Sequence, residues 1–314
     1  MMLRGRRTWQ KMIAAGAIDA AGAKNNRADA ANSRAGRGDG RAWQKASAWT
    51  LRALVWLAAG LTMGAFVLLV GYVLVKGIPN LNAQLFAWNY TSENVSMMPA
   101  LMGTILMTAV ALAISAPLGI LSAVYLVEYA RRESKWVALV RLASETLSGI
   151  PSIVYGLFGL LFFVTRLGWG YSMMAGAATL AIMTLPLIMR TTEEALLSVP
   201  DSYREGCFGL GAGRLRTVFS IVLPSAAPGI LSGIILAIGR IVGETAALIY
   251  TAGTVAQLPN SLFSSVRTLA VHMYSLSSEG LHVGAAYATA AVLLIVVVVI
   301  NALSGLIAGR ISKG

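Results

Sequence analysis

The 314-residue chain is 57% hydrophobic and only 12% charged, whereas an ordinary soluble domain is roughly 25% charged. Its formal net charge is +12, and several apolar runs exceed about 18 residues, the length that favours a membrane-spanning helix. These properties exclude a soluble core and favour a polytopic α-helical membrane protein over a barrel of alternating strands. Because membrane proteins carry an excess of Lys and Arg on their cytoplasmic side, the positive charge does not require a nucleic-acid partner.

Residues 1–50 are rich in Ala, Gly, Asn and Arg. They contain no apolar run long enough for the core of a signal peptide. We expect a basic, mostly disordered cytoplasmic arm that helps to fix the topology. The alternative is an arm that lies on anionic membrane lipid, attracted by its basic residues.

Six apolar spans follow and form a permease domain over residues 51–312. Their expected limits are 51–75, 99–127, 146–165, 172–190, 227–252 and 285–309. If the N-terminus is cytoplasmic, the inner segments hold 21 Lys and Arg residues and the outer loops hold three. Because positive residues accumulate on the cytoplasmic side, both termini are predicted inside.

Small residues and prolines punctuate these spans. A GxxxG spacing lets helices approach closely in lipid. It occurs at four pairs, Gly60/Gly64, Gly229/Gly233, Gly239/Gly243 and Gly305/Gly309. Pro117 in the second span and Pro186 near the end of the fourth are expected to kink or end their helices.

The segment 191–226, between the fourth and fifth spans, is too long to be a simple connector. Pro200 and Asp201 suit a first helical turn, Gly209, Gly211 and Gly213 break the helix, and Pro224 is expected to stop the helix that follows. The sequence predicts helix, glycine turn and helix at the inner membrane surface. Its apolar residues suit a docking surface: Tyr203, Phe208, Leu210, Leu215 and Val218.

This loop resembles the E-A-A-x3-G-x9-I-x-L-P signature of the membrane subunits of ABC importers. Glu205 takes the Glu position and Gly211 the Gly position, and the two alanines are replaced by small residues. The full set of matching positions is Glu205, Gly206, Cys207, Gly211, Ile221, Leu223 and Pro224. The resemblance implies an all-α fold, a polytopic transmembrane bundle of six spans of the ABC importer permease (MetI-like) type. It also implies that the loop couples to a separate ATPase.

The chain itself has no Walker A motif, because the dipeptide Gly-Lys never occurs. We therefore expect a permease subunit that is not an enzyme and binds no cofactor. ATP and Mg²⁺ would be used by the partner ATPase. The single cysteine, Cys207, excludes an internal disulfide, and His272 and His282 are expected to be ordinary loop residues rather than metal ligands.

Arg240 and Glu244 stand four residues apart inside an otherwise apolar span. An ionisable residue within a membrane span is a functional candidate by default. On one helix the two side chains would share a face about 6 Å apart along the axis. One interpretation is a structural ion pair; the other is that Arg240 meets an anion in an aqueous path, since a guanidinium fork matches two phosphate oxygens.

Several segments resemble the permease subunits of the Pst-type high-affinity phosphate importer: "RTTEEAL" (190–196), "IPSIVYGLFGLLFFV" (150–164), "GRIVGETAALIYTAG" (239–253) and "RTLAVHMYSLSSEG" (267–280). The Arg-x3-Glu-Thr element, here Arg240, Glu244 and Thr245, is shared by both permeases of that system. The last two segments resemble the PstA-type rather than the PstC-type subunit.

The resemblance implies several partners and a location. These are a PstC-like second permease, two PstB-like ATPase subunits, a PstS-like extracytoplasmic phosphate-binding protein and the lipid of a bacterial inner membrane, with no nucleic acid. Three alternatives stay open: a permease for another oxyanion such as molybdate or sulfate, an ion-driven secondary transporter, and a scaffold that binds an ATPase but passes no substrate.

Overall fold

A computed structural model describes residues 49–131 and 134–311, with the side chains of Ser304 and of residues 307–311 left undescribed. The described residues form helices and loops without strands, which confirms the all-α prediction. The predicted N-terminal arm lies outside them, apart from residues 49 and 50, which begin a helix. The chain divides into two units, Met1–Val70 and Gly71–Gly314, and each is described by itself.

Five helical segments of the described chain are long and apolar enough to cross a membrane, judged by length and composition alone. The first is helical from residue 49 to residue 77. The others are α2 (Met98–Val124) with its π-helical extension η3 (Tyr125–Tyr129), α5 (Met173–Leu197), α7 (Arg214–Thr217) with π-helical η5 (Val218–Val222) and α8 (Leu223–Val242), and α11 (Val283–Ile311). They correspond to five of the six predicted spans.

The predicted third span, 146–165, is instead part of a sharply bent pair. Helix α3 (Lys135–Ser148) meets α4 (Ser152–Gly159) and its π-helical continuation η4 (Leu160–Arg166) at 101°. The bend falls at Pro151, because a proline disfavours helical geometry at the residue before it. The Tyr155 hydroxyl donates a hydrogen bond of 2.7 Å to the Leu147 carbonyl across this corner. Counting the pair as one span gives the predicted total of six.

None of the three prolines singled out in the sequence as helix breakers ends a helix of the described chain. Pro117 and Pro186 lie inside α2 and α5, and neither ends its helix. The expectation that Pro224 stops a helix is wrong, because this residue lies in the first turn of α8 directly after η5. A proline in the first turn of a helix costs little, because the N–H that it lacks would have no partner within the helix there. The wider π-helical turn before it already shifts the pattern of main-chain hydrogen bonds.

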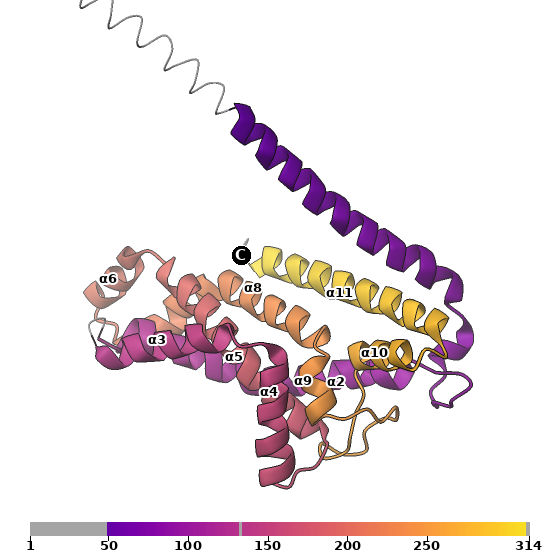
Figure 1. The fold of residues 1–314 in the computed structure, drawn as a ribbon. Helices are drawn as coiled ribbons and strands as arrows, with labels where there is room; N and C mark the ends of the chain where they lie inside the picture. Colours follow the sequence, from indigo (N-terminus) through magenta and orange to yellow (C-terminus); the bar gives the residue numbers. More distant parts are fainter. Residues whose placement is uncertain (1–48, 132–133, 312–314) are drawn as a thin grey trace, which may run out of the picture. The chain divides into compact units, whose positions relative to one another are not determined.

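Helix α5 lies at the centre of the second unit, between α2 and α8 (Figure 1). Its buried Leu180 and Met183 pack into a core with Met107 of α2 and Ile241 of α8. On the other side α8 packs against α11, and α4 packs against α9 (Ala246–Thr251). The remaining elements are the short η1 (Ile78–Asn80) and η2 (Ala83–Phe86), the surface helix α6 (Asp201–Gly209) and α10 (Leu269–Glu279).

Two of the predicted glycine pairs behave differently in this unit. At Gly229 an added Cβ would lie 2.6 Å from the Ala195 Cβ, and at Gly233 it would collide with the Thr191 hydroxyl. This pair therefore permits the close approach of α5 and α8, as predicted. An added Cβ at Gly239 would meet open space, so no neighbouring helix of the described chain crowds this turn.

Candidate substrate pathway and coupling loop

The fifth span is broken beside its charged residues. Helix α8 ends at Val242 and α9 begins at Ala246, so the prediction of one continuous helix over 227–252 is wrong. Arg240 lies in the last turn of α8, whereas Glu244 lies in the break and the two do not share a helix face. Gly243 caps the end of α8, and its amide donates a hydrogen bond of 3.3 Å to the Gly239 carbonyl.

Glu244 and Thr245 act locally in the break. The Glu244 carboxylate accepts a hydrogen bond of 3.1 Å from the Ala247 amide, in the first turn of α9. The Thr245 hydroxyl donates to the Gly243 carbonyl at 3.5 Å. Both interactions satisfy main-chain groups that the end of one helix and the start of the next leave open. Neither residue lines the pocket that contains Arg240.

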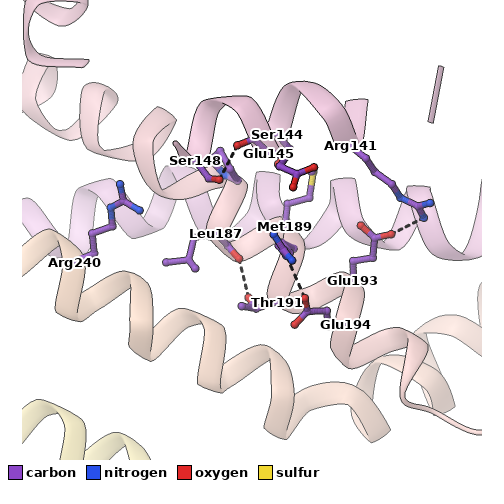
Figure 2. Close-up of a pocket in the computed structure, with 12 residues that line it drawn as sticks. Arg141, Ser144, Glu145, Ser148, Leu187, Met189, Thr191, Glu193, Glu194 and Arg240 are labelled. Atoms are coloured by element: carbon purple, nitrogen blue, oxygen red, sulfur yellow. Dashed lines mark hydrogen bonds and ion pairs between the residues drawn. The ribbon is translucent and has the colours of Figure 1, made fainter. Parts of the chain in front are cut away.

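Arg240 lines a pocket of about 470 Å³ between α3, α5 and α8. Figure 2 shows Arg240 and Arg141 at opposite ends of this pocket. The lining residues are Arg141, Ser144, Glu145, Ser148, Pro186, Leu187, Met189, Arg190, Thr191, Glu193, Glu194 and Arg240. Three cations and three carboxylates therefore face one cavity. Five of the six come from segments between the predicted spans or from the end of the fourth span, and only Arg240 comes from well inside a predicted span.

The charges of the pocket are unevenly paired. Arg141 forms an ion pair of 2.5 Å with Glu193, and Arg190 forms one of 3.2 Å with Glu194. Arg240 forms no ion pair and no side-chain hydrogen bond with any described residue. Among the described arginines of this pocket, Arg240 is therefore the one without a carboxylate partner, and all of its donors are available to an anion.

Sequence analysis assigned no pathway role to Arg141, Arg190, Glu193 or Glu194. The last three lie in the segment "RTTEEAL", quoted there only for its resemblance. Their spacing on α5 gave one usable signal, since Arg190 and Glu194 are four residues apart on one helix. Nothing local indicated Arg141, because its place in the pocket depends on the 101° bend that follows α3.

The loop between α5 and α8 has the predicted order of helix, glycine turn and helix. Helix α6 ends at Gly209, Gly211 adopts a left-handed φ of +80°, and α7 begins at Arg214. The turn is closed by hydrogen bonds from the Gly211 amide to the Phe208 carbonyl and from the Ala212 amide to the Cys207 carbonyl. A side chain at position 211 would be strained, because residues other than glycine rarely adopt this φ.

The predicted coupling residues are spread along this loop. Glu205, Gly206, Gly211, Ile221 and Pro224 are exposed, and Cys207 and Leu223 are half-buried. Four of the five apolar docking residues are also exposed: Tyr203, Phe208, Leu210 and Leu215. Val218 is the exception and is buried, because it belongs to η5 and packs beneath the loop, while Phe219 next to it is exposed.

Comparisons with known proteins agree with this arrangement. Residues 115–313 match the family described as binding-protein-dependent transport system inner membrane component. The probable ABC transporter permease protein YqgI of Bacillus subtilis (strain 168) is 35% identical over 78% of this chain and 89% of its own length. The phosphate transport system permease protein PstA 1 of Mycobacterium tuberculosis (strain CDC 1551 / Oshkosh) is 36% identical over 66% of this chain and 69% of its own length.

A solved bacterial ABC transporter for the import of the acidic polysaccharide alginate has a chain of the same fold. The match has a TM-score of 0.57 at 15% identity and covers 82% of this chain and 96% of that one. The chain therefore belongs to the family of binding-protein-dependent transport system inner membrane components, and it is a multi-pass ABC importer permease whose ATPase is a separate chain.

Proposed function

We propose that this chain is the PstA-type permease subunit of an importer that moves inorganic phosphate into the cell by alternating access. Relatives with the name of phosphate permease, at 33–40% identity, support the substrate class. The observation that carries the proposal within this chain is the unpaired guanidinium of Arg240 in the pocket between α3, α5 and α8. Its planar donor fork matches two oxygens of a phosphate.

The paired arginines of the pocket refine this proposal. Arg141 and Arg190 already have carboxylate partners, so their net attraction for an anion is reduced. A pathway in which every arginine was free would hold phosphate tightly, whereas transport requires that the anion also leaves. One unpaired arginine beside two paired ones, with the Glu145 carboxylate also lining the pocket without an ion pair among the described residues, would let the anion be recognised and then released. Glu244 and Thr245 would support this site by holding the break beside Arg240 rather than by contacting phosphate.

The partners and orientation are proposed with it. The chain would pair with a PstC-like permease, two PstB-like ATPase subunits and a PstS-like phosphate-binding protein. ATP and Mg²⁺ would act on the ATPase, and this chain would bind no cofactor. The excess of Lys and Arg in the segments around α3, the coupling loop and the termini supports both termini being cytoplasmic, and the family match supports a bacterial inner membrane location.

Arg240→Gln tests the proposal in proteoliposomes that contain the whole complex and the binding protein. Losing two charge-assisted hydrogen bonds, each worth about 1.5–3 kcal/mol, should lower phosphate uptake by roughly a hundredfold or more. Arg166→Gln, which changes an exposed arginine of η4 outside the pocket, should leave uptake unchanged. Uptake by an assembled Arg240→Gln complex at the wild-type rate would refute the role of Arg240.

The same assay separates the alternatives. Phosphate uptake that is competed by unlabelled phosphate, but not by molybdate or sulfate, supports the proposed substrate. Stronger competition by molybdate or sulfate would assign the permease to another oxyanion. Uptake that persists without ATP would indicate an ion-driven transporter, and ATPase binding without any uptake would indicate a scaffold.

A further inference from the structure

Arg204, on helix α6 of the coupling loop, is held by more partners than any other described arginine. Its Nε and Nη2 donate to the Glu128 carboxylate at 3.1 and 2.7 Å. Its Nη1 donates to the Val199 carbonyl at 2.8 Å and to the Asp201 carboxylate at 3.2 Å. Its Nη2 also donates to the Leu196 carbonyl at 3.0 Å. One guanidinium thus joins three segments: α6, the end of α5 and η3.

The pair between Arg204 and Glu128 is withdrawn from solvent. The two side chains are 14% and 9% exposed, whereas the Arg190–Glu194 pair on α5 is 67% and 65% exposed. A guanidinium that contacts a carboxylate through two nitrogens, away from solvent, fixes both the distance between the two side chains and their relative orientation. Glu128 lies 76 residues before Arg204 in the chain, so this contact bridges two elements that the chain does not connect directly.

The carboxylate lies where α2 becomes π-helical. Helix α2 ends at Val124, and η3 continues it through Tyr129, closed by a hydrogen bond of 2.9 Å from the Ala130 amide to the Tyr125 carbonyl. Single π-helical turns occur often at functional positions. The π-helical turn therefore presents Glu128 to α6 at the end of a helix of transmembrane length.

A second arginine of the loop contacts the next residue of η3. The Arg214 guanidinium of α7 lies 5.8 Å from the centre of the Tyr129 ring, within the range of a cation–π interaction. Beneath these contacts, Leu126 of η3, Leu196 of α5 and Val218 of η5 share one buried cluster. Both arms of the coupling loop are thus fastened to the same π-helical turn.

The neighbouring residue on α6 points elsewhere. Glu205 is exposed and forms no ion pair with a described residue. Successive residues on a helix are rotated by about 100°, so Arg204 faces the membrane helices while Glu205 faces outward. A helix of nine residues therefore has one side available for a partner and another fixed to α2 and α5.

We propose that the Arg204–Glu128 pair is a mechanical link that makes the end of α2 move with the coupling helix. Without the pair, only the Arg214–Tyr129 contact and the buried cluster would join the loop directly to the end of α2, and motion of the loop would pass mainly through the chain to α5 and α8, its two covalent neighbours. The inference rests on the proposed function, in which an ATPase pushes this loop. Arg204 and Glu128 are positioning residues and touch no substrate.

Glu128→Gln tests the link in the reconstituted complex, because glutamine preserves the shape of the side chain but removes its charge. We expect the ATPase to bind and hydrolyse ATP, while phosphate taken up per ATP falls about tenfold, in the range of a typical coupling energy. A purely structural role would lower assembly, hydrolysis and uptake together. Asp201→Asn is the matched control, since it removes the exposed partner of the same guanidinium and should leave this ratio unchanged.

Spin labels at positions 125 and 202 test the link without a transport assay, in a Cys207→Ala background that restores the alanine of the E-A-A signature. Tyr125 and Ser202 are both exposed, one on η3 and the other on α6, and neither belongs to the proposed docking surface. Their separation should stay the same in the nucleotide-free and ATP-trapped complexes and should change between these states in Glu128→Gln. A separation that changes in the otherwise unmodified complex would overturn the link, as would wild-type uptake per ATP in Glu128→Gln. A wild-type complex that takes up no phosphate would instead overturn the proposed function.

Discussion

His272 illustrates how a single residue can differ from its sequence-based expectation. It was expected in a polar loop, but it lies in α10 and is fully buried. Its Nε2 contacts the Val95 carbonyl at 3.2 Å, and its Nδ1 contacts Arg267 Nη1 at 3.3 Å. Because an arginine can only donate, Nδ1 must accept, and the neutral ring carries its proton on Nε2. The described residues contain no cluster that could hold a metal ion.

Burial and the neighbouring Arg267 lower the pKa of His272 from 6.5 to about 4. The unfolded chain therefore binds more protons than the folded chain between these two pH values, and stability should fall as the pH falls from 6.5 to about 4. The loss should reach about 3 kcal/mol at the lower end. Thermal unfolding of the purified complex at several pH values measures it. In His272→Gln this part of the pH dependence should vanish, and its persistence would assign the effect to another group.

At the scale of elements, the contact between α5 and α8 depends on positions without side chains. Gly229 and Gly233 face Ala195 and Thr191 of α5. Thr191 also lines the pocket, and its hydroxyl donates to the Leu187 carbonyl at 2.9 Å. The approach of these two helices therefore fixes one wall of the proposed pathway as well as the packing of the bundle.

Gly233→Ala should separate α5 from α8, because its Cβ would collide with the stiff side chain of Thr191. Overpacking of this kind costs about 1–3 kcal/mol. Gly239→Ala is the control on the same helix, where an added Cβ meets open space. We expect a lower unfolding temperature and lower uptake for Gly233→Ala only. Equal stability of the two variants would contradict a close contact at Gly233.

At the scale of the whole molecule, the coupling loop and the charged pocket use the same helices. Helix α5 carries Arg190 in the pocket and ends at Leu197 beside the loop, and α8 leads from the loop to Arg240. Movement of the loop by a partner would therefore change the two walls of the pocket. This continuity gives alternating access a physical basis in which packed helices move as rigid elements.

Docking of the ATPase should fail when the outer surface of the loop is changed. Glu205→Arg reverses an exposed charge, and Gly211→Trp places a bulky side chain at a left-handed φ of +80°. Both variants should lose co-purification of the ATPase while the pair of permeases remains assembled. Asp201→Asn, in the first turn of α6, is the control and should retain the ATPase. Normal co-purification of Glu205→Arg and Gly211→Trp would refute the docking assignment.

The sequence alone determined the class of this protein. Runs of apolar residues have few ways to satisfy their main chain in lipid except as helices, so the five long spans and the all-α fold followed from composition. The glycine turn of the coupling loop could also be predicted from a short stretch of sequence, because glycine can adopt a φ that other residues avoid. The family resemblance of residues 205–224 depended on the same short-range pattern.

Only the tertiary structure decided which charges meet. Arg141 reaches the pocket because the chain bends by 101° after α3, Glu128 meets Arg204 across 76 residues, and Glu244 leaves the face of Arg240 because α8 ends at Val242. Hydrophobic periodicity reports how one segment faces an apolar environment. It carries no information on which distant polar group will compensate a buried charge, since that depends on how separate helices pack.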